Sequence, residues 1–108
     1  MIIEQMSISA SDGGAAELCS VLASLTGPTE VQPGCLSCQI YQSWNDPNQV
    51  FLLAKWANAG DLIAHLQSDI YKRLLLLIEL APNPPVLQFY MVREVHGLEL
   101  VEQARLTH

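Results

Sequence analysis

The sequence predicts an α+β domain whose elements follow the order strand, helix, strand, strand, helix, strand. Several stretches of strand length alternate between apolar and polar residues or are apolar throughout, and two regions repeat apolar residues at helical spacing. Clusters of Gly, Pro and Asn separate these stretches and indicate turns. At 108 residues the chain has room for one modest hydrophobic core, so we expect a single domain over residues 1–108.

The first strand and the first helix are predicted at the start of the chain. Residues Ile2–Ala10 alternate as a half-buried strand does, although Glu4 falls on the apolar side. Ser11 or Asp12 is suited to cap the following helix, and Thr26–Pro28 is expected to end it. The apolar positions of this helix, at three- and four-residue steps, are Ala15, Leu18, Cys19, Leu22 and Leu25.

A β-hairpin is predicted in the middle of the chain. Its strands are Cys35–Trp44 and Val50–Trp56, and the Asn, Asp and Pro residues between them favour a turn. Apart from Lys55, the second of these strands is apolar on both faces, which indicates that it is covered on both sides.

The second helical region is predicted in two parts. The first part, Asp61–Leu66, begins near Ala59, and Ser68 is placed to cap a new start after a break. The second part, Ile70–Leu80, is apolar nearly all round, so we expect it to lie wedged between layers. A cluster of prolines then ends this helix.

The last strand completes the order of elements that defines the fold. Residues Val86–Val95 are again apolar on both faces, and residues 98–108 form a C-terminal tail without a clear pattern. The order is that of the split βαβ, or ferredoxin-like, fold, in which both helices cover one face of an antiparallel sheet. Because two strands are apolar on the uncovered face as well, we expect two such sheets to stack in a homodimer.

Composition argues against several classes of partner. The net charge of -6 leaves no basic surface for nucleic acid or for an anionic membrane. The first residues lack the basic region of a signal peptide, and the longest apolar run, Leu74–Ile78, is too short to span a membrane. Three cysteines cannot all pair within one chain, so we expect a reduced, cytoplasmic protein.

One set of residues recurs along the chain in a recognisable order. They are Pro33, Gly34, Cys35, Leu36, Asp46, Pro47, Trp56, Asp61, Leu62, His65, Ser68, Tyr71, Pro85, Phe89 and Gly97. This set resembles the antibiotic biosynthesis monooxygenase (ABM) family over residues 1–105. The resemblance implies a dimeric α/β barrel, and monooxygenase activity on quinols or polycyclic aromatic compounds without metal, flavin or haem.

Haem-degrading members of the same family imply a different site, which this sequence does not match. The resemblance gives those members an Asn in the first strand, a Trp early in the second helix and an iron-binding His about three turns later. Here the first strand has no Asn, the Trp position holds His65 and the His position falls near Leu75. Haem breakdown is therefore not expected.

Five residues are candidates for the chemistry of a cofactor-free site. His65 is the candidate base, because a neutral imidazole with a pKa near 6.5 can accept the proton of a phenol or hydroquinone. Tyr71 is the candidate to orient a substrate oxygen, and Trp56, Phe89 and Leu62 are candidates to line an aromatic ring. The alternative for each is a structural role: a buried histidine held by a neighbour, a half-buried tyrosine, and core packing.

Other conspicuous residues are interpreted as structural. Glu4 and Arg93 are expected to pair inside the barrel, since the first and last strands of this topology are neighbours. Cys35 and Cys38 form a C-x-x-C motif but are expected on opposite faces of a strand, which argues against a zinc or redox site. Two histidines are expected to be solvated in the tail: His96 and His108.

These observations together lead to one hypothesis and two rivals. The hypothesis is a homodimeric monooxygenase that needs no cofactor and no metal and oxidises a small phenolic or quinol-type aromatic with dioxygen. The rivals are a non-catalytic dimer that binds or senses a small molecule in the same cavity, and an interaction protein whose cavity is filled by side chains. An open pocket beside His65 would favour the first two readings over the third.

Overall fold

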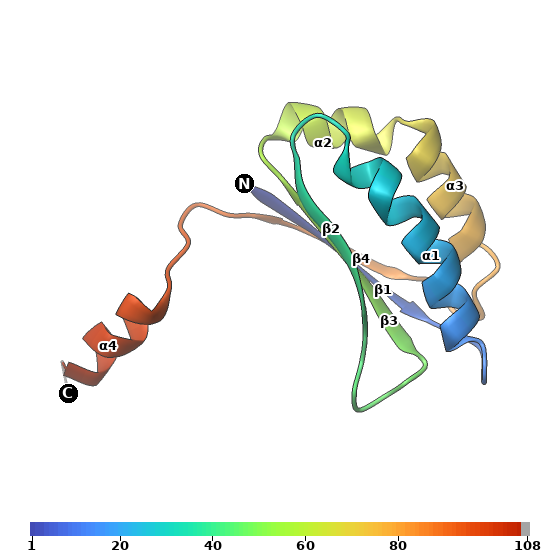
Figure 1. Ribbon diagram of the computed structural model, residues 1–108, viewed down its shortest axis with the longest axis horizontal. Coiled ribbons are helices and arrows are strands. Elements are labelled where there is room, and N and C mark those ends of the chain that lie inside the picture. Colours follow the sequence, from blue (N-terminus) through green and yellow to red (C-terminus); the bar gives the residue numbers. More distant parts are fainter. Residues whose placement is uncertain (107–108) are drawn as a thin grey trace.

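The computed structural model describes residues 1–106 and contains four strands and four helices (Figure 1). The strands are β1 (Ile2–Ser9), β2 (Cys35–Gln42), β3 (Gln49–Trp56) and β4 (Val86–Met91). The helices are α1 (Ala15–Glu30), α2 (Ala59–Leu66), α3 (Asp69–Ile78) and α4 (Leu98–Leu106). The predicted order is confirmed, with the second helical region in two parts and an additional helix in the tail.

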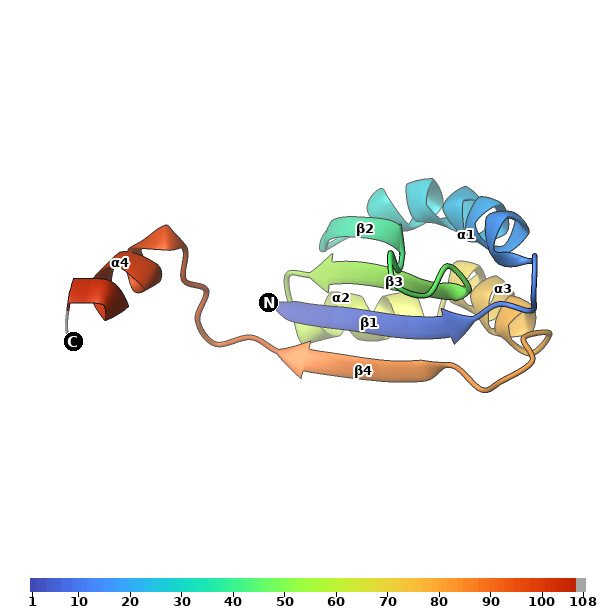
Figure 2. The ribbon, with the colours of Figure 1, turned by 90° about the horizontal axis from the view of Figure 1, so that it is seen from below.

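The strands form one antiparallel sheet in the order β2-β3-β1-β4. Helices α1, α2 and α3 lie on one side of this sheet (Figure 1, Figure 2). This arrangement is the predicted ferredoxin-like α+β fold. Because β4 lies at the edge beside β1, that edge of the domain is open to solvent.

The hydrophobic core lies between the sheet and the three helices. On β1 and β3 every second side chain is buried, as the period of a strand requires. The buried apolar residues of the strands are Ile2, Met6, Ile8, Cys38, Val50, Leu52, Ala54 and Trp56. Those of the helices are Ala15, Leu22, Leu25, Leu62, Tyr71, Leu74 and Ile78.

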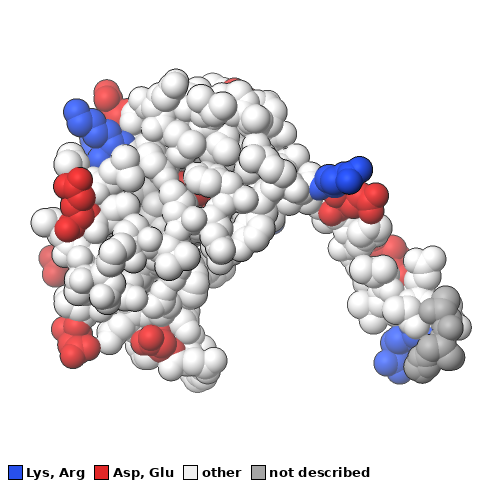
Figure 3. Space-filling view, turned by 180° about the vertical axis from the view of Figure 1, so that it is seen from behind, with Lys and Arg blue, Asp and Glu red and all other residues white. Residues whose placement is uncertain are grey.

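The opposite face of the sheet is uncovered in the single chain. Phe51 and Leu53 on β3 are only half-buried, and every residue of β4 is exposed. On the side of the molecule shown in Figure 3, charged side chains lie mainly at the rim of the body and on the C-terminal arm. The sequence predicts that β3 and β4 are covered on both faces. One copy of the chain does not provide this cover.

Helix α3 lies at the surface, so the prediction that it is wedged between layers is wrong for one copy. Tyr71, Leu74 and Ile78 face the core, whereas Leu75 and Leu76 are exposed. The sheet lies along one side of α3 and α1 along another, and the remaining side has no neighbour in the single chain.

Helix α1 continues to Glu30, past the predicted end at Thr26–Pro28. Pro28 has no N–H to give to the carbonyl of Ser24, but both residues are exposed, so water can bond that carbonyl. The last turn is held by burial of Leu25 and Thr29, whose Oγ1 donates to the Leu25 carbonyl at 2.7 Å. Burial of one side of the helix thus outweighs the local effect of proline.

The helix starts differ in how they are capped. Gly14, not Ser11 or Asp12, precedes α1, and no side chain caps it. Asn58 caps α2 by accepting from the backbone N–H of Asp61. Ser68 caps α3 by accepting from the backbone N–H of Tyr71, as predicted.

The chain leaves the sheet after Met91 and forms an arm that ends in α4, away from the body (Figure 1). β4 is therefore shorter than the predicted Val86–Val95, and β2 likewise ends at Gln42 rather than Trp44. No residue of α4 is buried. Within residues 1–106, no helix has both the length and the apolar character that crossing a membrane would require.

Candidate functional site

Three rings from three elements meet between the sheet and the helices. The Trp56 ring, at the end of β3, stacks on the His65 imidazole of α2, with 4.5 Å between ring centroids and 28° between planes. The Tyr71 ring of α3 approaches the same imidazole edge-on at 5.2 Å and 83°. All three residues are buried. The structure thus brings together three of the residues that the sequence singled out.

The imidazole of His65 is held in one orientation by a residue that the sequence analysis missed. Its Nδ1 is hydrogen-bonded to Oε1 of Gln32, a carbonyl oxygen that can only accept, so Nδ1 carries the hydrogen. The lone pair is then on Nε2. Burial lowers the pKa of His65 below its usual 6.5, which keeps the ring neutral at neutral pH.

The loop that carries Gln32 needs a glycine. Gly34 has a φ of +79°, and a Cβ at this position would come within 2.2 Å of Oδ2 of Asp61 in the first turn of α2. The Gly34 carbonyl also accepts from the backbone N–H of Ala57 at 2.8 Å. These contacts fix the loop against the start of α2 and bring Gln32 to the side of His65.

Glu4 is a fully buried carboxyl group beside the ring cluster. Its Oε1 accepts from the indole Nε1–H of Trp56 at 3.3 Å, and its Oε2 has no hydrogen-bond partner. The predicted ion pair with Arg93 is wrong, because β4 ends at Met91 and Arg93 is exposed on the arm. Burial raises the pKa of Glu4 above its usual 4.5, and interactions with Trp56 and Tyr71 lower it by less.

A small cavity lies among these groups. Its volume is about 10 Å³, which is room for roughly one water molecule. The residues that line it are Glu4, Leu25, Thr29, Cys38, Leu52, Ala54, His65, Ile70, Tyr71 and Leu74. An open pocket beside His65 of the size of an aromatic ring is therefore not present in this conformation. Of the five predicted site residues, His65 and Tyr71 line the cavity.

The other three predicted residues lie around the cavity and not on its wall. The Trp56 ring is stacked on His65, and Leu62 is buried on α2 one turn before it. Phe89 is paired with Glu4 in the β1–β4 register, so both side chains are on the helix-covered face of the sheet. Phe89 is 37% exposed, because it lies on the edge strand.

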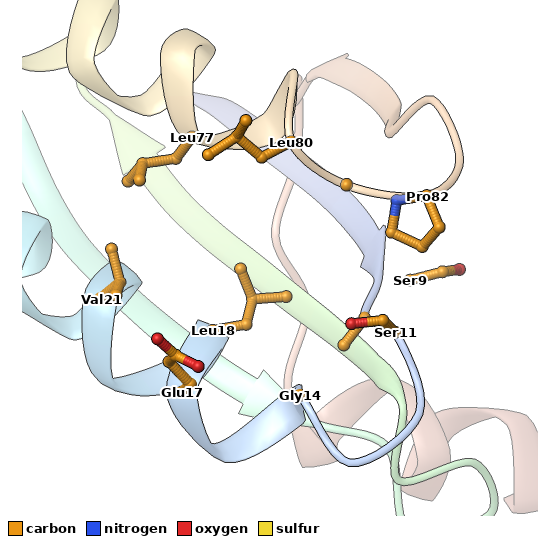
Figure 4. Close-up of a pocket in the computed structure, with 11 residues that line it drawn as sticks. Ser9, Ser11, Gly14, Glu17, Leu18, Val21, Leu77, Leu80 and Pro82 are labelled. Atoms are coloured by element: carbon orange, nitrogen blue, oxygen red, sulfur yellow. The ribbon is translucent and has the colours of Figure 1, made fainter.

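A second, larger hollow opens at the other end of the helix pair. It has a volume of about 250 Å³ and lies between the N-terminal half of α1 and the C-terminal end of α3. Leu18 and Val21 face Leu77 and Leu80 across it (Figure 4). Glu17 and two serines at its rim are polar, and the remainder of the lining is mostly apolar.

The large cleft and the small cavity both lie along the contact between α1 and α3, which run antiparallel. The cleft is lined by Leu18 of α1 and Leu77 of α3, and the cavity by Leu25 of α1 and Leu74 of α3. One helical turn on each side therefore separates the two hollows. On α1 that turn is filled by Leu22, which is fully buried.

The C-x-x-C motif lies differently from what the sequence predicts. Because a register shift separates Cys35 from Ser37, Cys35 pairs with Trp56 and Cys38 with Ala54, and both cysteines are on the helix-covered face. The prediction that they point to opposite faces is wrong. Both are free thiols, and burial raises the pKa of Cys38 to about 12. No cluster of three metal-binding side chains occurs within residues 1–106.

His96 plays no part in this site. His96 is exposed on the arm, with its Nε2 at 3.1 Å from Oε2 of Glu94, as a solvated residue is expected to be. His108 lies outside the described residues.

One comparison with known proteins identifies a family. The family model described as antibiotic biosynthesis monooxygenase matches residues 1–75. No curated protein sequence matches the chain.

Solved structures show the same fold at low sequence identity. A proposed antibiotic biosynthesis monooxygenase from Deinococcus radiodurans superposes with a TM-score of 0.83 at 21% identity, over 90% of this chain and 97% of the other. The protein Rv0793 from Mycobacterium tuberculosis has a TM-score of 0.79 at 18% identity, over 89% and 98% of the two chains. A conserved protein from Methanosarcina mazei has a TM-score of 0.77 at 22% identity, over 85% of this chain and 92% of the other.

Proposed function

Because the chain belongs to the antibiotic biosynthesis monooxygenase family, we propose that it is a cofactor-independent monooxygenase of small phenolic or quinol-type aromatics. For a simple phenol, the ring carbon opposite the hydroxyl gains one atom of dioxygen and becomes a carbonyl. The ring loses two hydrogen atoms, and the second oxygen atom leaves as water. The reducing electrons come from the substrate, so the protein needs to supply only binding and proton transfer.

The observation that carries this proposal is the state of His65. The Nδ1–H bond to Gln32 leaves the lone pair on Nε2, and burial keeps the ring neutral. A neutral imidazole can take the phenolic proton, and the resulting phenolate is electron-rich enough to pass an electron to dioxygen.

The remaining predicted residues are given supporting roles in this proposal. Tyr71 lines the cavity with an unpartnered hydroxyl, which suits it to orient a substrate oxygen. Trp56 supports the imidazole by stacking on it. Leu62 and Phe89 would close the apolar surroundings of the ring on the α2 and β4 sides.

A substrate ring needs more room than the cavity beside His65 has, so the proposal includes an opening step. Separation of α1 and α3 near Leu22 would join the cavity to the 250 Å³ cleft, which has the apolar lining that an aromatic compound requires. Val21→Trp would fill the cleft and is expected to lower kcat/KM by at least tenfold. Ala23→Trp, on the exposed side of the same helix, is the matched control and should leave kcat/KM unchanged.

We include a homodimer in the proposed function. The support is the apolar surface that one copy leaves uncovered, on both faces of β4 and on α4. Light scattering of the purified chain would measure its mass. A monomer at micromolar concentration would remove this part of the proposal and leave the chemistry at His65 untouched. A cytoplasmic location also stays a prediction.

The direct test is oxygen consumption with a panel of hydroquinones and polycyclic phenols. The native protein is expected to consume oxygen and give a quinone that contains one new oxygen atom from dioxygen, with no reaction under anaerobic conditions. His65→Ala is expected to lower kcat by about 10²- to 10⁴-fold, the usual contribution of a general base. His96→Ala is the matched control, since His96 is exposed on the arm. Equal rates for the native protein and His65→Ala would end the assignment of His65 as the base.

A non-catalytic binding protein is the second candidate, and the cleft between α1 and α3 favours it. The cleft at Leu18 and Leu77 is large enough to bind an apolar compound without contact to His65. Such a protein would show a higher melting temperature with ligand and no oxygen uptake. An oxygen electrode and a thermal shift measurement on the same compounds separate the two candidates.

A further inference from the structure

Glu4 is the most unusual polar residue of the core. It stands on β1 between Ile2 and Met6, on the face that packs against the helices, and it is 0% exposed. Its neighbours across the sheet are Ala54 on β3 and Phe89 on β4. No lysine or arginine pairs with it within residues 1–106. A buried carboxylate without a cation is costly, so a neutral acid is the favoured form at this position.

The hydrogen bonds indicate which oxygen of Glu4 carries the proton. Oε1 accepts from the indole N–H of Trp56, so the acid hydrogen belongs on Oε2. Neither Oε2 nor the hydroxyl of Tyr71 has a partner within hydrogen-bonding distance, although the two groups lie close enough to shift each other's pKa. Both residues line the cavity of about 10 Å³ beside His65. Two O–H groups thus meet at a space that holds one oxygen atom.

The charge state agrees with this geometry. Burial is the largest influence on Glu4 and raises its pKa. Burial, the largest influence on Tyr71, raises its pKa further above its usual 10, so its hydroxyl also keeps its hydrogen. Known enzymes use this combination, a tyrosine and a carboxylic acid kept neutral by an apolar site, to stabilise a negatively charged oxygen.

We propose that Glu4, as an uncharged carboxylic acid, and Tyr71 form a two-donor site for the oxygen of a phenolate. The proposal rests on the proposed function and specifies its substrate as a compound whose ring hydroxyl ionises during the reaction. The phenolic proton moves to Nε2 of His65, and the negative charge left on the oxygen is stabilised by Oε2–H of Glu4 and the hydroxyl of Tyr71. The protons of Glu4 and Tyr71 stay in place. Trp56 is a positioning residue, because its N–H fixes the other oxygen of Glu4.

The first test measures the protonation of Glu4 without substrate or oxygen. An infrared spectrum at pH 7 is expected to contain the carbonyl band of one buried carboxylic acid, and this band should be absent in Glu4→Gln. Glu17→Gln, at an exposed carboxyl group on α1, is the matched control and should retain the band. A native spectrum without a carboxylic acid band at pH 7 would overturn the proposal.

The second test measures the affinity for substituted phenols under anaerobic conditions. Glu4→Gln keeps a donor and is expected to bind within about threefold of the native protein. Glu4→Leu and Tyr71→Phe each remove one donor, and each is expected to weaken binding by roughly 10- to 100-fold, as for one hydrogen bond to a charged group. Binding of the corresponding methyl ethers, which cannot ionise, should change little.

Equal affinity of the native protein and Glu4→Leu for the phenols would refute the two-donor site. Neither test uses oxygen, so a protein that binds phenolates in this way but consumes no oxygen would refute the proposed function alone. If Glu4→Leu does not fold, the infrared comparison and the Tyr71→Phe affinities decide the matter.

Discussion

The contact between Gln32 and His65 allows a prediction that does not depend on knowing the substrate. Gln32→Glu would replace the amide oxygen that accepts from Nδ1 of His65 by a carboxylate oxygen at the same place. Opposite unit charges about 4 Å apart attract by about 4 kcal/mol at an effective dielectric constant of 20, equivalent to about 3 pKa units. Because the pair is only partly buried, we expect a rise of roughly 1 to 2 units.

The pKa of His65 should therefore lie below the usual imidazole value of 6.5 in the native protein and above it in the variant. Burial lowers the pKa of His65 below 6.5 in the native protein, and the carboxylate in Gln32→Glu is expected to raise it above 6.5. Proton NMR of the histidine ring hydrogens at a series of pH values measures both. The signals of His96 and His108 are identified by substitution, and His96 serves as an internal control because it is exposed.

The same variants should also change the reaction in a defined way. In the proposed mechanism the base acts as the neutral ring, so the acidic limb of the pH–rate profile is expected to move to higher pH in Gln32→Glu, together with the NMR titration. Gln32→Leu removes the acceptor and is expected to lower kcat at every pH, because the imidazole loses its fixed tautomer. A native His65 that titrates at or above 6.5, or an NMR shift without a matching kinetic shift, would refute this reasoning.

Three further predictions concern stability. Gly34→Ala is expected to lower the free energy of unfolding by more than about 2 kcal/mol, because the φ of +79° and the contact with Asp61 both oppose a Cβ. Gly27→Ala, in an open helical position, is the control and should change the free energy of unfolding by less than about 1 kcal/mol. Urea unfolding measures both. Ser68→Ala removes the cap of α3 and is expected to cost about 1 kcal/mol in the same assay. The folded-state pKa of Glu4 lies above its unfolded value near 4.5, so the unfolded chain releases this proton at a lower pH than the folded chain does. The stability that Glu4 contributes is therefore complete below the unfolded pKa and is lost as the pH rises through the folded pKa. Urea midpoints from pH 5 to pH 9 should fall for the native protein relative to Glu4→Gln, and parallel curves would contradict the pKa direction.

The elements of the fold could be predicted because the patterns that define them are local. The alternation of Ile2, Met6 and Ile8 is confirmed in β1, and the cap at Ser68 is confirmed in α3. The exact ends depended on contacts that the sequence does not display. α1 passes Pro28 because Leu25 and Thr29 are buried against the sheet, and only the fold shows that they are.

The site was predictable in its histidine and aromatic residues and not in the groups that control them. Gln32 lies in a loop, and only the positive φ of Gly34 brings its side chain to His65. Glu4 did carry a signal, a charged residue on the apolar side of a strand, but a cation was the expected partner. The structure gives it Trp56 instead, because Arg93 comes after the end of β4.

The arrangement of these polar groups differs from that of an ordinary core. A core that only stabilises the fold would hold an apolar side chain at position 4, since an unpaired buried polar atom costs about 1 to 3 kcal/mol. Here Oε2 of Glu4 and the hydroxyl of Tyr71 are both unpaired, and both line the same small cavity as His65. Each group has its place fixed by a neighbour: Trp56 holds Glu4, the cap at Ser68 starts the helix of Tyr71, and Gln32 orients His65. Fixed donors with an unmet bond are what a ligand oxygen requires, and under the proposal made above the binding of a phenolate would recover the cost of these unpaired atoms.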